Sequence, residues 1–195
     1  MSDAADPVEP SPIPASGPTP ASGPASAPDD APGRASRQWV AFLALAAGIV
    51  IADQISKAWV VATVSFGSVL PVFGDYVRIW NVHNTGALFG LFRDQAVLFA
   101  ALSVGVVALI VWFHGRSVVT NGWFATLALG LLLGGAVGNL ADRLRLGYVV
   151  DFMDMGIGDM RFYTYNVADA AISTALVLLI LMAFGPSRRR PWIAG

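Results

Sequence analysis

The chain has 195 residues, of which 55% are hydrophobic and only 13% are charged, with a net charge of -1. A soluble domain is about 25% charged, so this composition excludes an ordinary soluble globular protein and indicates an integral membrane protein. The chain has no cysteine, which excludes disulfides, a thiolate nucleophile and a thiol metal site. Its arginines are scattered or lie at the ends of apolar runs, so no nucleic-acid partner is predicted.

Residues 1–36 carry nine of the twelve prolines, separated mainly by Ala, Ser and Gly. A segment of this composition buries too little apolar surface to become ordered, so we predict a disordered cytoplasmic tail. The Ala-rich stretch at 44–47 leaves an alternative, in which the first apolar run is a cleaved signal sequence. The long Pro-rich lead and the charged residues within that run argue against this alternative.

Four apolar runs follow the tail, and each is close to the roughly 20 residues that a helix needs to cross a bilayer. We therefore predict an all-α membrane protein, a four-helix bundle at 37–186, followed by a basic cytoplasmic C-terminus at 187–195. Four spans place both termini on the same side. The predicted spans are 39–61, 95–113, 123–141 and 167–184.

The positive charges orient this bundle, because cytoplasmic loops of membrane proteins are enriched in Lys and Arg. Arginines precede the first run, separate the second from the third and follow the fourth, so these three segments are predicted to be cytoplasmic. Three arginines in the predicted outer segments are weaker signals to the contrary. The cytoplasmic set is Arg34, Arg37, Arg116, Arg188, Arg189 and Arg190.

Residues 66–84 differ from the apolar runs, because they are rich in β-branched and aromatic residues and alternate in places. Val77, Arg78 and Ile79 show this alternation, and a turn is predicted around Gly74. We expect a small β hairpin or sheet on the outer membrane surface.

Polar residues gather at the predicted outer ends of the spans and in the outer connections. Ionisable groups at membrane depth are costly and are usually kept for function, so their convergence predicts a shared site near the outer leaflet. Several are spaced for contact on one helix face, at intervals of three or four residues. The candidates are Asp53, Lys57, Asn84, Asn139, Arg143, Asp151, Asn166 and Asp169.

The third run also carries Gly130, Gly134 and Gly138 at intervals of four residues. Small residues at this spacing leave one stripe of a helix without side-chain bulk. We therefore predict that a neighbouring helix packs closely on this stripe, with no chemical role for the glycines.

Structural alternatives remain for individual candidates. Asp53 and Lys57 could form only a neutralising ion pair that fixes helix packing. Arg143 could anchor its helix at the interface, and Asp151 could be a solvated loop acid. Ser56 beside Lys57 suggests a Ser-Lys protease, but adjacent helical residues point about 100° apart. The two histidines are predicted on opposite membrane sides, so no metal site is expected.

Five sequence blocks resemble, in order, the motifs of lipoprotein signal peptidase, also called signal peptidase II. Together they cover nearly the whole membrane domain. Two positions depart mildly from the family pattern, with Leu88 where Ala is common and Tyr165 where Phe is common. The blocks are D-Q-I-S-K at 53–57, N-T-G-A-L-F-G at 84–90, G-G-A-V-G-N-L-A-D-R at 134–143, G-Y-V-V-D-F at 147–152 and Y-N-V-A-D at 165–169.

The resemblance implies an aspartyl endopeptidase of the bacterial inner membrane. Its implied substrates are diacylglyceryl-modified prolipoproteins, cut just before the lipidated Cys, and its other implied partners are membrane lipids and a globomycin-type inhibitor. No cofactor or metal is expected. Asp151 and Asp169 match the family's catalytic pair, and Asp53 and Lys57 match polar residues that support the site. The matching site-lining residues are Asn84, Gly86, Asn139, Arg143 and Asn166.

Two neighbouring carboxylates are expected to share one proton, because close like charges disfavour double ionisation. Asp169, on the first turn of a helix, is predicted to be the ionised member, and Asp151, beside Val149, Val150 and Phe152, the protonated one. A non-catalytic lipoprotein-binding scaffold and a small proton-coupled transporter remain the alternative functions.

Overall fold

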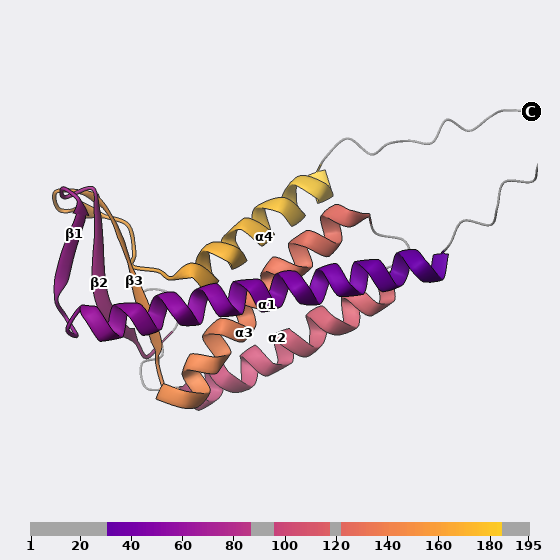
Figure 1. The fold of residues 1–195 in the computed structure, drawn as a ribbon, viewed down its shortest axis with the longest axis horizontal. Coiled ribbons are helices and arrows are strands. Elements are labelled where there is room, and N and C mark those ends of the chain that lie inside the picture. Colours follow the sequence, from indigo (N-terminus) through magenta and orange to yellow (C-terminus); the bar gives the residue numbers. More distant parts are fainter. Residues whose placement is uncertain (1–30, 87–95, 118–121, 185–195) are drawn as a thin grey trace, which may run out of the picture. The chain divides into compact units, whose positions relative to one another are not determined.

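The computed structural model describes residues 31–86, 96–117 and 122–184. Its helices are α1 (Ala31–Thr63), α2 (Ala96–Ser117), α3 (Trp123–Leu146) and α4 (Val167–Phe184), as Figure 1 shows. All four are long and apolar enough to cross a bilayer. This confirms the predicted four-helix membrane fold, and the chain is a multi-pass membrane protein. The segments 1–30 and 187–195 and Leu88 lie outside the described residues.

Two helices extend beyond the limits predicted for the tail and the spans. Helix α1 begins at Ala31, so residues 31–36 are helical although the composition predicts a disordered tail up to residue 36. Pro32 permits this because a proline in the first helical turn removes an N–H that has no intrahelical partner. Helix α3 extends to Leu146, five residues beyond the predicted end at 141. This extension places Asp142 and Arg143 on the helix itself.

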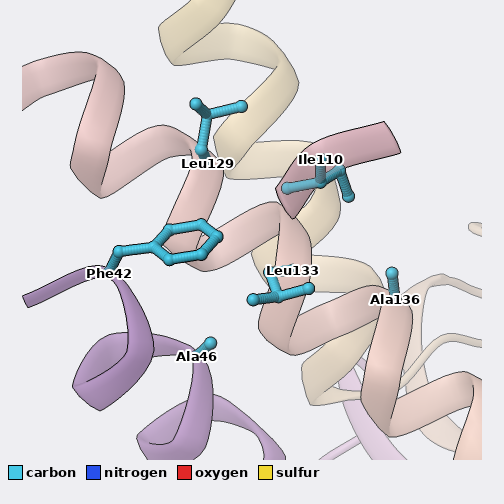
Figure 2. Close-up of a cluster of buried hydrophobic side chains, with 6 residues drawn as sticks. All are labelled: Phe42, Ala46, Ile110, Leu129, Leu133 and Ala136. Carbon is cyan, nitrogen blue, oxygen red and sulfur yellow. The ribbon is translucent and has the colours of Figure 1, made fainter. Parts of the chain in front are cut away.

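Helix α3 is the central helix of the described bundle and contacts α1, α2 and α4. Its Leu129, Leu133 and Ala136 pack with Phe42 of α1 and Ile110 of α2 in a buried apolar cluster (Figure 2). Large apolar side chains on the outward faces of the other helices are exposed, as expected for surfaces that meet lipid. One buried core of the described residues therefore lies along α3, and a second joins the end of α1 to the sheet through Val60, Ile79 and Phe152.

The glycine stripe of α3 faces α1, which confirms the predicted close approach of a neighbouring helix. A Cβ atom added to Gly134 would lie 2.7 Å from Cβ of Ile49, and one added to Gly138 would lie 2.8 Å from Oδ2 of Asp53. Real Cβ contacts essentially never reach these distances. The absence of side chains therefore allows α1 to approach α3 closely, and at Gly138 it makes room for a carboxylate.

The sheet contains four antiparallel strands in the order β1 (Val69–Phe73), β2 (Val77–Asn84), β3 (Val149–Ile157) and β4 (Met160–Arg161). The β1–β2 hairpin confirms the prediction for residues 66–84. Strand β3 was not predicted, because its pairing with β2 joins segments far apart in sequence. This strand carries Asp151, whose Cα is in register with Val82. Asp151 is therefore a buried strand residue, and the alternative of a solvated loop acid is wrong.

An ion-pair cluster stabilises the end of this sheet that contains the β1–β2 and β3–β4 turns. Asp154 of β3 is only 1% exposed and binds Arg78 at 2.6 Å and Arg161 at 2.9 Å. Burial by itself would raise the pKa of Asp154, but hydrogen bonds from the two arginines outweigh it and lower this pKa below its usual value. Asp75, in the β1–β2 turn, also binds Arg78 and accepts the N–H of Gly158. The two hairpin turns are thereby joined.

Candidate functional site

The first turn of α4 is closed by a reciprocal pair of hydrogen bonds. Asp169 donates its main-chain N–H to Oδ1 of Asn166 at 2.9 Å, and Asn166 donates its main-chain N–H to Oδ2 of Asp169 at 3.3 Å. This is the arrangement of a capping box, with Asn166 in the N-cap position and Asp169 three residues later. The helix start therefore fixes the Asp169 carboxylate in place.

Asp151 approaches the same point from β3. The main-chain N–H groups of Phe152 and Met153 donate to the carbonyl oxygen of Tyr165 at 3.0 and 2.7 Å, which ties β3 to the segment leading into α4. Asp151 is 4% exposed, and its Oδ1 accepts a 2.7 Å hydrogen bond from Nδ2 of Asn166. Asn166 thus contacts both carboxylates.

Amide side chains supply the remaining donors to these acids. Nδ2 of Asn84 donates to Oδ2 of Asp151 at 2.9 Å, and Nδ2 of Asn139 donates to Oδ1 of Asp169 at 2.8 Å. Gly86 donates its N–H to Oδ1 of Asn84 at 3.1 Å, which fixes the direction of that amide. Every oxygen of the two acids therefore accepts a hydrogen bond from the protein.

The environment of Asp151 raises the pKa of its carboxyl group to about 7. Burial is the main cause, and the negative charge of Asp169 adds to it. Hydrogen bonds from Asn84 and Asn166 and the positive charge of Lys57 act in the opposite direction without cancelling the rise. Asp151 can consequently hold or release a proton near neutral pH, which is the property expected of an acid–base catalyst.

This shift predicts how Asp151→Asn changes the pH dependence of stability. Between about pH 4 and 7 the folded state keeps a proton that the unfolded chain has lost, so wild-type stability falls as pH rises through this window. The variant lacks this titration. Its stability relative to wild type should therefore increase by up to about 1.4 kcal/mol per pH unit from pH 4 to 7 and then level off. Thermal unfolding in detergent between pH 4 and 8 measures this, and a flat difference would contradict the raised pKa.

A buried ion cluster lies directly behind the amides. Nζ of Lys57 lies 2.8 Å from Oδ2 of Asp53 and 2.9 Å from Oδ2 of Asp142, and it donates to Oδ1 of Asn139 at 3.1 Å. The predicted contact between Asp53 and Lys57 is confirmed. Ser56 donates its hydroxyl to the main-chain oxygen of Asp53 at 2.8 Å instead of pairing with Lys57, so the geometry does not favour a Ser-Lys protease.

Asp142 and Gln54 were not among the predicted site residues. Nε2 of Gln54 donates to Oδ1 of Asp142 at 2.9 Å, and Oδ2 of Asp142 accepts the N–H of Val150 at 3.1 Å. The sequence did contain a signal for Asp142. It continues the four-residue spacing of the stripe that ends at Gly138, so it faces α1 as the glycines do.

Arg143 lies at the edge of the site. Its NH1 donates to the main-chain oxygen of Asn139 at 3.3 Å, and its guanidinium lies 5.6 Å from the ring centroid of Phe99 in α2. The hydrogen bond ties the guanidinium to the main chain of its own helix. Within the part of the chain that the structure describes, no cluster of His, Asp or Glu is suited to hold a metal ion.

The family model described as signal peptidase (SPase) II matches residues 45–185. The chain belongs to the signal peptidase II family. The matched range contains every residue of the site described above. The chain is therefore a peptidase, and the family is one of aspartic peptidases.

Individual relatives agree with this family assignment. The lipoprotein signal peptidase of Moorella thermoacetica is 38% identical over 153 residues, which cover 77% of this chain and 99% of that protein. The lipoprotein signal peptidase of a Nostoc species is 42% identical over 129 residues, covering 66% of this chain and 80% of that protein. The signal peptidase II resemblance drawn from the five motif blocks is confirmed.

Solved structures resemble the fold as well. One is a bacterial membrane enzyme determined by the in meso method at 2.3 Å resolution, with a TM-score of 0.65 and 26% identity. That match covers 73% of this chain and 86% of the solved chain. A second bacterial membrane enzyme, determined at 1.9 Å resolution, has the same TM-score and identity over 75% of this chain and 94% of its own.

Proposed function

We propose that this chain removes the signal peptide from diacylglyceryl-modified prolipoproteins, cutting just before the lipidated Cys, with Asp151 and Asp169 as its catalytic pair. The observation that carries the proposal is the convergence of two carboxylates, from β3 and α4, on the side chain and main chain of Asn166. The names of the similar proteins, lipoprotein signal peptidases, supply the substrate class.

The chemistry requires one ionised and one protonated acid. Asp169, at the positive end of the α4 dipole, takes a proton from water, whose oxygen attacks the scissile carbonyl carbon. Asp151, whose pKa is about 7, donates its proton to the carbonyl oxygen. When the intermediate collapses, Asp169 passes its proton to the leaving nitrogen and Asp151 recovers the proton from the oxygen. No covalent bond to the enzyme forms.

The surrounding residues would position the substrate and the pair. Asn84, held by Gly86, and Asn166 keep the Asp151 carboxyl in place, and Asn139 does the same for Asp169. Arg143 has a planar fork of donors suited to peptide carbonyls.

The location of this site explains why the enzyme is a membrane protein. The site lies where the transmembrane helices meet the sheet, so the diacylglyceryl chains can stay in the bilayer while the scissile bond reaches the two acids. We place the protein in a bacterial inner membrane, with both termini on the cytoplasmic side and the site near the outer leaflet. The distribution of arginines supports this orientation. A globomycin-type inhibitor is expected to occupy the same site.

The test uses the full chain in lipid vesicles. A diacylglyceryl-modified prolipoprotein should be cut immediately before the modified Cys, as identified by mass spectrometry, while the same precursor without the lipid should be cut far more slowly. Equal cleavage of both precursors would contradict the lipid requirement. Binding without cleavage would instead support a scaffold.

A further inference from the structure

Lys57 bridges two buried acids instead of pairing with one. Its ammonium group lies 2.8 Å from a carboxylate oxygen of Asp53 and 2.9 Å from one of Asp142. The exposed fractions of Asp53, Lys57 and Asp142 are 0%, 3% and 2%. A single acid would neutralise the lysine, and a second buried carboxylate carries a large desolvation cost. The second acid therefore needs an explanation beyond charge balance.

Each acid also holds the main chain of an element that carries one of the catalytic pair. Oδ1 of Asp53 accepts the N–H of Ala168 at 3.0 Å, and Oδ2 of Asp142 accepts the N–H of Val150 at 3.1 Å. Ala168 immediately precedes Asp169, and Val150 immediately precedes Asp151. The two contacts are equivalent, although they come from different helices, α1 and α3.

Lys57 reaches the pair by a third route. Its ammonium donates to Oδ1 of Asn139 at 3.1 Å, and because an ammonium group cannot accept a hydrogen bond, this contact fixes the direction of the amide. Nδ2 of Asn139 is then left to donate to Asp169. Because the Asn139 amide donates, Oδ1 of Asp169 acts as a hydrogen-bond acceptor and not as a proton donor.

We propose that Asp53, Lys57 and Asp142 form a clamp of positioning residues that sets the separation and the hydrogen-bond direction of the two catalytic carboxylates. The proposal rests on the proposed function of Asp151 and Asp169. The clamp transmits the packing of α1 against α3 to the main chain beside each acid, so it fixes β3 and α4 relative to each other. The three clamp residues are buried, and they act on the pair through hydrogen bonds to Val150, Ala168 and Asn139 and through their charges.

The charges around the pair make the clamp measurable by pH. Loss of the positive Lys57 makes it harder to ionise nearby acids, so both limbs of the pH–activity profile should move to higher pH. Loss of the negative Asp142 should move them to lower pH. A general loss of folding cannot produce shifts of opposite sign. The charged groups facing the pair are Asp53 and Lys57 from α1 and Asp142 and Arg143 from α3, with Arg145 attached through Gln54.

Four variants of the full chain in lipid vesicles test the clamp against a lipid-modified precursor. Asp142→Ala removes the acceptor of the Val150 N–H and should lower kcat by about 10²-fold, with KM changed less than about threefold. Asp142→Asn keeps an oxygen at that position and should recover at least about tenfold of this loss. Lys57→Gln should shift both pH limbs upward. Ser56→Ala, on the same helix but outside the clamp, should match wild type.

The outcomes separate the clamp from the proposed function. Wild-type kcat and unshifted pH limbs in both Lys57→Gln and Asp142→Ala would overturn the clamp. If Asp142→Ala does not fold, the test uses Lys57→Gln and Asp142→Asn, whose pH limbs should shift in opposite directions. Shifts of the same sign would overturn the clamp. Retained cleavage by Asp151→Asn would instead overturn the proposed function, whatever the clamp variants do.

Discussion

Replacing either Asp169 or Asp151 by Asn is expected to lower kcat for prolipoprotein cleavage by about 10²–10⁴-fold, the usual contribution of general acid–base catalysis. The Asp169→Asn variant has no carboxylate to take the proton from water. The Asp151→Asn variant has no carboxyl proton to give to the carbonyl oxygen, although the new amide keeps the size of the acid. The substrate contacts themselves are unaffected, so KM should change far less than kcat.

A matched control comes from the same sheet. Asp159, in the β3–β4 turn, is exposed, and Asp159→Asn makes the same chemical change away from the site. It should leave kcat and KM unchanged. The measurement is initial-rate kinetics for all three variants in the same vesicles, with thermal unfolding to show that each is folded. Cleavage within about tenfold of wild type by either site variant would rule out the two-acid mechanism.

Local spacing was sufficient to predict much of this architecture. The apolar runs predicted four spans because crossing a bilayer requires length and apolarity, which a sequence shows directly. The four-residue interval between Asp53 and Lys57 also predicted their contact, because helix geometry alone places residues at this spacing on one face. The glycine stripe likewise predicted close packing, and α1 is the partner.

The features that the sequence did not predict depend on contacts between distant segments. Strand β3 forms by pairing with β2, so nothing in the local pattern around Asp151 identifies it as a strand. The second role of Asp53 depends on Ala168, 115 positions away. Asp142 continues the spacing of the glycine stripe, but it lies beyond the predicted end of its span, and the structure shows that α3 extends past it to Leu146. Topology brought the acids to one region, but only the tertiary structure showed which groups hold them.

The second large effect is expected from Gly135, on the face of α3 that meets α4. A Cβ atom at this position would collide with the main-chain oxygen of Ala168 and would lie 2.7 Å from Cγ1 of Ile172. Alanine favours a helix over glycine by about 1 kcal/mol, but overpacking of this kind costs about 1–3 kcal/mol. Gly135→Ala should therefore lower stability despite its better helix propensity.

The same collision should reduce activity, because Ala168 is the residue before Asp169. Helix α4 can relieve the clash only by moving away from α3, which displaces the acid from Asn139, and a displacement of about 1 Å can cost about 10²-fold in rate. Gly105→Ala in α2 is the control, since a Cβ there meets nothing within 4 Å and should leave activity unchanged. Unfolding midpoints and kcat for both variants decide the matter. Wild-type values for Gly135→Ala would mean that the separation of α3 and α4 does not set the geometry of the two acids.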